Sequence, residues 1–283
     1  MNSKVIDFAP PLPRVDCIDA GAGQLVMLVH ASLSGARQWS PLMRELCGRM
    51  ALRAVNLFGY GATPAWAEWR PPTLDDYAEL LARAIPRSAR RVSLVGHSFG
   101  GAVAMQAAAR QLQGRVERLV LIEPSPFYLL DQCGRQDASR ELSVLSNLTK
   151  QCIADGRPEV AAVMFIDYWG GAGTWSASPP ERRAEFIRLI PLIANEWNAA
   201  LDGEWPLADW VADLPANTLL ISALNTKRPS AAVVQLLLEA RPDWECASLR
   251  EGGHMVPVTH LHLVNPIIAE FLTRNAPKSR LIG

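Results

Sequence analysis

Short apolar runs alternate with segments of helical periodicity along most of the chain. The runs are short and nearly continuous, as expected for strands buried on both faces of a sheet, and they occupy residues 24–30 (QLVMLVH), 52–57, 91–95, 116–122, 217–223 and 244–249. Helical patterns lie between them, at residues 37–48, 73–85, 98–112, 230–240 and 261–276. This alternation predicts an α/β fold with a mostly parallel sheet flanked by helices.

One long segment interrupts the alternation. Between residues 126 and 212 the pattern is helical, with a glycine-rich turn near residue 171 and few strand-like runs. We therefore expect a core made of residues 1–125 and 213–283, with a helical insertion at residues 126–212.

The charge balance excludes some classes of protein. The 283 residues include 28 Lys and Arg against 28 Asp and Glu, so the formal net charge is zero. A neutral chain lacks the basic surface expected of a nucleic-acid-binding protein, and a hydrophobic content of 49% with 20% charged residues is typical of a globular one. No run of 18 apolar residues predicts a membrane span.

The cysteines and the N-terminal segment predict a cytoplasmic location. The five cysteines are scattered and form no CxxC pair, which favours free thiols in a reducing compartment. The segment before Cys17 contains three prolines and no apolar stretch, so we expect no signal peptide. The histidines and cysteines show no metal-ligand spacing, and we expect neither a metal nor another cofactor.

A candidate nucleophile lies at the turn between the strand at 91–95 and the helix that follows it. Residues 96–100 (GHSFG) have the pattern G-x-S-x-G, in which a sharp strand-to-helix turn exposes the hydroxyl of the serine, here Ser98. The helix N-terminus offers backbone N–H groups to a developing oxyanion. A glycine-rich turn of a nucleotide-binding fold is the alternative, although neither GxxxxGK[ST] nor GxGxxG occurs here.

His254 is the candidate general base. It follows Gly252 and Gly253 in a loop after the last predicted strand, and such a loop lets an imidazole reach over the strand ends toward Ser98. Its place far downstream of the serine is the order of a Ser…acid…His arrangement. His260, near the start of the last helix, is the alternative.

These motifs make the chain resemble the α/β-hydrolase fold superfamily, in its serine-esterase-like form with a helical cap. The resemblance runs from about Leu25 to the C-terminus and depends on the Ser98 turn, on His30-Ala31 at a strand end and on the loop of His254. It implies that the helical insertion is the cap.

The resemblance also implies an oxyanion hole. Its donors would be the backbone N–H groups of Ser32, which follows the His30-Ala31 pair, and of Phe99. The superfamily usually has glycine where this chain has Ala31, so we expect an ordinary φ angle at that position.

The acid of the expected triad is missing from its usual place. In the superfamily it follows the strand here at 217–223, but residues 224–228 (LNTKR) contain no carboxylate. Glu123 directly follows the strand at 116–122, where some members, including haloalkane dehalogenases, carry their acid, and a carboxylate there could reach Nδ1 of His254. A dyad without a charged acid is one alternative. The others are aspartates near the end of the insertion: Asp202, Asp209 and Asp213.

Aromatic residues are concentrated in the insertion, which contains five of the nine tryptophans. Such a density indicates either the roof of an apolar pocket or the insertion's own core. The pocket candidates are Trp39, Phe127, Trp169 and Trp175.

The sequence therefore predicts a serine hydrolase that cleaves a small uncharged carboxylic ester through an acyl-enzyme on Ser98, with His254 as the base and Glu123 as the acid. Dehalogenases and epoxide hydrolases of this fold use aspartate where this chain has serine, which favours acyl chemistry. A lactonase and a C–C bond hydrolase would use the same triad. A ligand-binding protein with slow catalysis is the alternative from another class. We expect no nucleic-acid or membrane partner, and the oligomeric state stays open.

Overall fold

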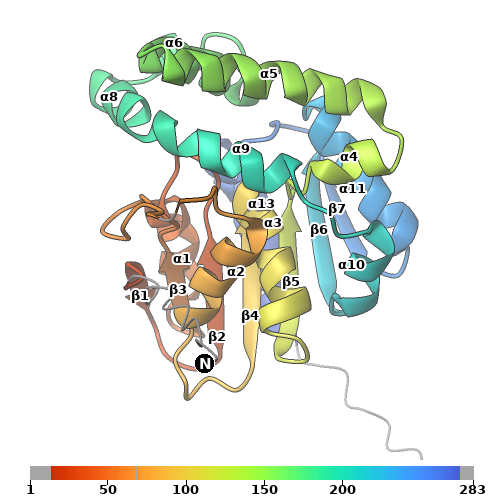
Figure 1. Cartoon of the computed structure of the whole chain (residues 1–283). Helices are drawn as coiled ribbons and strands as arrows, with labels where there is room; N and C mark the ends of the chain where they lie inside the picture. Colours follow the sequence, from red (N-terminus) through yellow and green to blue (C-terminus); the bar gives the residue numbers. More distant parts are fainter. Residues whose placement is uncertain (1–13, 68, 275–283) are drawn as a thin grey trace, which may run out of the picture.

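A computed structural model describes residues 14–67 and 69–274. In Figure 1, helices cover both faces of a central sheet, and further helices lie above the edge where most of the strands end. The predicted absence of a signal peptide concerns a segment that lies mostly outside the described residues. Residues 275 and 276, the predicted end of the last helix, also lie outside them.

The sheet confirms the predicted parallel architecture. In the described part of the chain seven strands pair in the order β1-β3-β2-β4-β5-β6-β7, and all neighbours are parallel except β1 and β3. The strands are β1 (Cys17–Ala20), β2 (Leu25–Val29), β3 (Ala51–Val55), β4 (Val92–His97), β5 (Val116–Ile122), β6 (Thr218–Ala223) and β7 (Glu245–Leu249). The sequence patterns did not indicate β1, because a four-residue, partly exposed edge strand carries little apolar signal.

The helices that flank the sheet follow the predicted segments, except for the short helix at residues 256–259, which the sequence patterns did not indicate. They are α1 (Ser40–Leu46), α2 (Leu74–Arg83), α3 (Phe99–Gln106), α11 (Arg228–Ala240), α12 (Val256–Thr259) and α13 (Leu261–Thr273). The Thr73 side chain caps α2 and forms a reciprocal capping box with Asp76, which explains why this helix begins at Leu74. A 3-10 turn, η1 (Ala36–Trp39), precedes α1, and a π-helical turn, η2 (Ala107–Gln111), extends α3.

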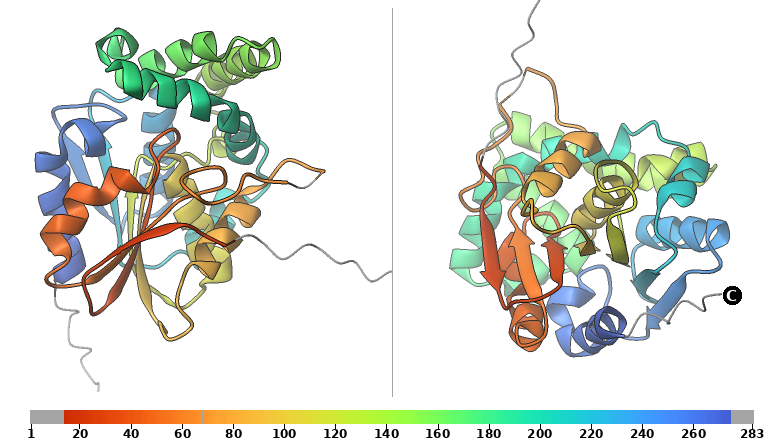
Figure 2. Two further views of the ribbon diagram at one scale, coloured as in Figure 1. Left: turned by 90° about the vertical axis from the view of Figure 1, so that its left-hand side faces the viewer. Right: turned by 90° about the horizontal axis from the view of Figure 1, so that it is seen from below.

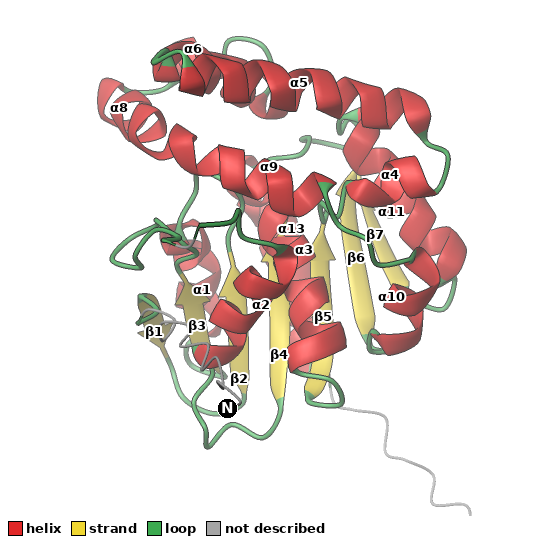
Figure 3. Ribbon diagram, in the orientation of Figure 1, coloured by secondary structure: helices red, strands yellow, loops and turns green. Residues whose placement is uncertain are grey.

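Helices make up most of the segment between β5 and β6. They are α4 (Tyr128–Gln132), α5 (Gln136–Ala154), α6 (Pro158–Gly170), α7 (Thr174–Ala177), α8 (Pro180–Leu189), η3 (Ile190–Leu192), α9 (Ile193–Leu201) and α10 (Leu207–Asp213). Figures 2 and 3 show α5, α6, α8 and α9, called the insertion helices below, above the carboxyl ends of the strands. In Figure 3, α10 instead lies lower, and it packs against α11 and η2. The division of the chain at residues 125 and 213 stays a prediction.

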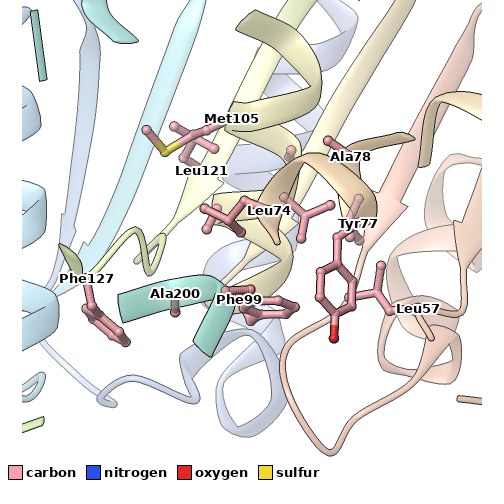
Figure 4. Packing of buried hydrophobic residues seen from close by; sticks show 14 of the residues in the cluster. Leu57, Leu74, Tyr77, Ala78, Phe99, Met105, Leu121, Phe127 and Ala200 are labelled. Carbon is pink, nitrogen blue, oxygen red and sulfur yellow. The ribbon is translucent and has the colours of Figure 1, made fainter. Parts of the chain in front are cut away.

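Two buried layers hold the fold together, one on each face of the sheet. The layer around α2 and α3 continues into the insertion, and Figure 4 shows Phe127 and Ala200 close to Phe99 within it. The other layer packs α1 and α13 against the opposite face. Because the first layer is continuous, burial of apolar surface attaches the insertion helices to the core.

Two further searches concern only the described ranges. None of the helices there is long and apolar enough to cross a bilayer. No group of three or more His, Cys, Asp or Glu side chains in those ranges could hold a metal ion.

Candidate active site

Ser98 stands at a strained turn between β4 and α3. Its φ of 54° and ψ of −121° lie outside the regions that most side chains adopt, and such strain persists only where the surroundings enforce it. The surrounding packing requires glycine, because a Cβ on Gly100 would lie 2.4 Å from the carbonyl oxygen of His30. The serine is 8% exposed, so its hydroxyl is at the bottom of a cleft.

Three predicted side chains form one hydrogen-bonded series. His254 Nε2 lies 2.7 Å from Ser98 Oγ, and His254 Nδ1 lies 2.8 Å from Glu123 Oε2. With Nδ1–H donating to the carboxylate, Nε2 is free to accept the serine proton. The structure therefore brings Ser98, His254 and Glu123 together in the order that a base-activated nucleophile requires.

Glu123 is held by donors on its other sides. Its Oε1 accepts hydrogen bonds from the Ala223 N–H at 2.9 Å and from the Ser222 hydroxyl at 3.3 Å, and its Oε2 accepts one from the Thr226 hydroxyl. Burial alone would raise the pKa of this carboxyl, but the contacts with His254, Thr226 and Ala223 hold the pKa below its ordinary value. Glu123 is thus a buried carboxylate kept ionised beside the imidazole.

The loop that lacks the usual acid supports Glu123 instead. Thr226 lies in residues 224–228, and its hydroxyl donates to Glu123 Oε2. The aspartate alternatives lie elsewhere, and Asp213 accepts a hydrogen bond from Gln113. The alternative base, His260, has its Nδ1 2.8 Å from the neighbouring Thr259 hydroxyl.

The loop after β2 leaves one backbone N–H free between two that are bonded. The Ala31 N–H donates to Gln38 Oε1 at 3.0 Å, and the Leu33 N–H donates to the Tyr60 hydroxyl at 2.9 Å. The described residues offer no acceptor to the N–H of Ser32 or of Phe99. Both residues line the cleft of Ser98, where two unpaired donors suit an oxyanion.

The backbone of this loop has the conformation expected at Ala31. Ala31 has no positive φ, whereas Leu33, two residues later, has a φ of 59°. The non-glycine residue with a positive φ in this loop is therefore a leucine. Its N–H bond to Tyr60 helps to hold this uncommon conformation.

A second series of hydrogen bonds connects this loop with the loop of His254. Gln38, which accepts from Ala31, has its Nε2 3.1 Å from His97 Nδ1, and His97 Nε2 lies 2.8 Å from the His254 carbonyl oxygen. Burial, reinforced by the nearby His254, lowers the pKa of His97 to about 3, so this ring is neutral and can accept at Nδ1 while donating at Nε2. One neutral histidine thus ties together the two loops that flank Ser98.

Two cavities meet at Ser98. The inner cavity encloses about 280 Å³ of atom-free space, and its lining residues are Ser32, Ser98, Phe99, Ser125, Phe127, Phe165, Trp169, Ile193, Glu196, Trp197 and Ala200. The outer cavity encloses about 900 Å³, and its lining residues are Ala31–Ser34, Ser98, Phe165, Ile166, Trp169, Gly170, Thr174, Ser178, Arg182, Phe186, His254, Met255, Val258 and Thr259. Both volumes include the openings to solvent. Trp169 borders both cavities, and its ring centre is 4.3 Å from that of His254.

Two of the four pocket candidates line these cavities. Phe127 and Trp169 do so, with their rings stacked 5.9 Å apart. The prediction for Trp39 is wrong, because its side chain is buried in the layer between α1 and the sheet. The prediction for Trp175 is also wrong, since its ring packs near Phe186 within the insertion and borders neither cavity.

Sequence patterns missed several polar groups at the site. One is Ser230, whose buried hydroxyl lies 3.1 Å from His254 Nδ1. The Ser125 hydroxyl lies 3.2 Å from Ser98 Oγ, and its position two residues after Glu123 was the available signal. Glu196, on α9, is a buried acid that accepts hydrogen bonds from Ser32 and Tyr60. No local pattern marks Glu196, because its partners are 164 and 136 residues away in the chain.

The family follows from a profile comparison. The profile of the Alpha/beta hydrolase family matches residues 26–266. The chain belongs to this family. Within it, the chain is 36% identical over 272 residues to a pimeloyl-(acyl-carrier protein) methyl ester esterase of Aromatoleum aromaticum, which covers 90% of this chain and 87% of that protein.

Other relatives match shorter parts of the chain. A methyl ester esterase of the same description from Aliivibrio salmonicida is 25% identical over 171 residues, or 62% of its own length. The 2-hydroxymuconate semialdehyde hydrolase of a Pseudomonas species is 34% identical over 114 residues, which is 38% of this chain and 39% of that protein. Among solved structures, the alpha/beta hydrolase MGS-M2 from a deep-sea metagenome has a TM-score of 0.77 at 15% identity, covering 94% of this chain and 97% of that one, which shows the shared fold.

Proposed function

We propose that this protein is a serine hydrolase that cleaves a carboxylic ester through an acyl-enzyme on Ser98. The observation that carries the proposal is the unbroken series from Ser98 Oγ through His254 to Glu123, with separations of 2.7 and 2.8 Å. The unpaired N–H groups of Ser32 and Phe99 beside it supply what a tetrahedral intermediate needs.

Each group in the series has a defined role in the proposed reaction. Ser98 Oγ attacks the ester carbonyl carbon while His254 Nε2 takes the hydroxyl proton, and the electron pair of the carbonyl π bond moves to oxygen. Glu123 stabilises the imidazolium, and the two N–H groups bind the oxyanion. His254 then returns the proton to the departing alkoxide, and a water molecule releases the acid by the same route.

The position of His254 favours one orientation of the substrate. The leaving oxygen must accept its proton from His254 Nε2, and His254 lines the outer cavity but not the inner one. The alcohol part therefore belongs in the outer cavity and the acyl part in the inner one. Because the inner cavity is small and mainly apolar, without a lysine or arginine in its lining, a short uncharged acyl chain suits it.

The test is a series of p-nitrophenyl esters from acetate to decanoate, measured on the wild type and on Ser98→Ala. We expect the highest kcat/KM for the shorter chains, and we expect a fluorophosphonate to add its mass to Ser98. An inert wild type that no fluorophosphonate labels would contradict the proposal and would favour a ligand-binding protein on this scaffold.

Cleavage of a C–C bond is the second candidate, favoured by the 34% identity to the 2-hydroxymuconate semialdehyde hydrolase. The same serine, histidine and acid would serve it. An assay with a ring-cleavage product of catechol as substrate discriminates between the two reactions. Hydrolysis of its C–C bond is monitored by the loss of the compound's absorbance. Turnover of that compound well above that of every ester would replace the first proposal with the second.

A further inference from the structure

Glu196 is a buried acid at the active site to which the steps above give no role. It lies on the insertion helix α9 (Ile193–Leu201), lines the inner cavity and is 3% exposed. Its neighbours along the same cavity wall, Ile193, Trp197 and Ala200, are apolar. An apolar residue would seal this wall at lower free energy than a carboxyl group does, because burial of an acid is unfavourable unless it is hydrogen-bonded.

One oxygen of the Glu196 carboxylate is hydrogen-bonded to the loop that follows β2, and the other is hydrogen-bonded to Tyr60, which itself contacts that loop. Oε2 accepts a hydrogen bond from the Ser32 hydroxyl, and Oε1 accepts one from the Tyr60 hydroxyl at 2.7 Å. The Tyr60 hydroxyl in turn accepts the Leu33 N–H at 2.9 Å. Glu196 therefore holds Ser32 directly and Leu33 through one intermediate.

These contacts constrain the one N–H that the loop leaves unpaired. The Ala31 N–H is taken by Gln38 and the Leu33 N–H by Tyr60, so the peptide of Ser32 is fixed on both sides while its own N–H has no acceptor in the described chain. The Glu196–Ser32 hydrogen bond adds a third constraint, on the side chain of the donor residue itself. An oxyanion donor is effective when its direction is set before the reaction begins.

We propose that Glu196 is a positioning residue of the oxyanion hole, through which the insertion helix α9 orients the backbone N–H of Ser32. The inference depends on the proposed acyl-enzyme mechanism and assigns the insertion a part in it beyond forming cavity walls. Attachment of α9 to the core would then be a condition for a complete oxyanion hole.

The ionisation of Glu196 is consistent with this arrangement. Burial raises the pKa of its carboxyl to about 7, even though the hydrogen bonds from Ser32 and Tyr60 favour the carboxylate. The titratable groups that face it are Tyr60 and Tyr77, and burial raises the pKa of both. Neither of these tyrosines is a cation, so within the described chain the Glu196 carboxyl is held only by the hydroxyl groups of Ser32 and Tyr60.

The test compares Glu196→Gln with a matched control, Glu141→Gln. Glu141 also accepts a hydrogen bond from a tyrosine hydroxyl within the insertion, that of Tyr168 at 2.6 Å, but it borders neither cavity. We expect Glu196→Gln to lower kcat for a p-nitrophenyl butyrate substrate about 10- to 100-fold with KM within about twofold of the wild type, since misorientation removes part of one donor's contribution. Glu141→Gln should keep the wild-type kcat.

A second measurement separates positioning from a general loss of structure. A trifluoromethyl ketone forms a tetrahedral adduct with an oxyanion, so its inhibition constant should rise with Glu196→Gln by about the same factor as kcat falls. Butyramide, a neutral analogue of the ester that forms no oxyanion, should bind nearly unchanged. Ser32→Ala removes the same hydrogen bond by removing its donor. The double variant with Glu196→Gln should therefore have a kcat little lower than that of Glu196→Gln alone.

Two outcomes overturn the inference. One is wild-type kcat in both Glu196→Gln and Ser32→Ala. The other is a fall in kcat without weaker binding of the trifluoromethyl ketone, while circular dichroism shows a folded protein. Neither outcome is confused with failure of the proposed function, which would leave the wild type itself unlabelled by a fluorophosphonate and inactive on every ester.

Discussion

The core and the insertion contribute to the candidate site in different ways. The core provides the series Ser98–His254–Glu123, in which Ser98 follows β4, His254 lies in the loop after β7 and Glu123 follows β5. Two of these residues have positive φ angles, 54° at Ser98 and 43° at Glu123. Two of the three members of the series are therefore held by strained backbone at the ends of buried strands.

The insertion adds no member to that series. Its helices supply aromatic walls around Ser98 and the buried Glu196. The difference suggests that the core sets the reaction, whereas the insertion sets which substrate fits and, through Glu196, how well the oxyanion hole is formed. Each prediction below tests the role assigned either to the core or to the insertion.

The largest effect should come from removing the core nucleophile. Ser98→Ala should lower kcat by a factor on the order of 10⁶, because no other group forms the acyl-enzyme. The measurement is ester turnover with active-site titration. Ser125→Ala, which removes a hydroxyl 3.2 Å from Ser98 Oγ, is the control and should lose far less activity. Equal losses would mean that the assignment of the nucleophile is wrong.

The core acid should have the next largest effect. Glu123→Gln should lower kcat about 10⁴-fold, because an amide cannot stabilise the imidazolium by charge. The matched controls, Asp202→Asn and Asp213→Asn, should retain wild-type turnover, since Glu123 Oε2 is the carboxylate oxygen beside His254 Nδ1. Wild-type turnover in Glu123→Gln, with a loss in either control, would transfer the acid's role to that aspartate.

The two regions should also respond to pH in opposite directions. In the core, burial lowers the pKa of His30 to about 4 and that of His97 to about 3. In the unfolded chain these groups bind a proton near pH 6.5, so the free energy of unfolding should fall as the pH drops from about 6.5 toward 4, by on the order of 3 kcal/mol for each histidine.

In the insertion, Glu196 gives the opposite slope over a pH window that overlaps the histidine window. Its pKa is raised to about 7, so in the window from about 4.5 to 7 the folded protein binds a proton that the unfolded chain releases. The free energy of unfolding should therefore fall as the pH rises through this window, by on the order of 3 kcal/mol. Urea unfolding of the wild type, His30→Asn and Glu196→Gln at pH 5, 6.5 and 8 checks both slopes. If the free energy of unfolding of Glu196→Gln changed between pH 5 and pH 8 as that of the wild type does, this account of Glu196 would be contradicted.

The smallest effect should come from the wall that the two cavities share. Trp169→Ala would join the inner and outer cavities, so KM for the preferred short ester should rise roughly tenfold and the acyl-chain preference should move to longer chains. Trp175→Ala, an equally buried tryptophan of the insertion that borders neither cavity, should change stability but not chain-length preference. The same change of preference in both variants would show that the insertion acts as a whole.

Much of the core could be predicted from local patterns. The parallel strands that bracket Ser98 appear as continuous apolar runs because both faces of the sheet are covered, and β5 begins and ends where expected, at Val116 and Ile122. The G-x-S-x-G turn, the capped start of α2 and the Gly-Gly-His254 loop are all encoded within a few neighbouring residues. Even the displaced acid was detectable, because Glu123 directly follows a strand next to that of Ser98.

The insertion was much less predictable, and the four pocket candidates illustrate why. All four are buried aromatic residues, and their composition alone does not separate a cavity wall from a packed interior. Phe127 and Trp169 face Ser98, whereas Trp39 and Trp175 pack elsewhere. The distinction depends on how the helices are oriented over the sheet.

Dependence on the tertiary structure also explains why the sequence did not predict the contacts of Glu196 or the hydrogen bond between Gln38 and His97. Their partners lie 59 to 164 residues away along the chain, so no short motif includes both ends of any of these hydrogen bonds. The order of strands and the residues at their carboxyl ends follow from short-range patterns, because a buried parallel strand and a tight turn each leave a local signature. Which distant side chains meet above those ends depends on packing across the whole fold. At this site, packing brought Thr226 and Ser222 to Glu123 and an acid from α9 to Ser32 in the loop after β2.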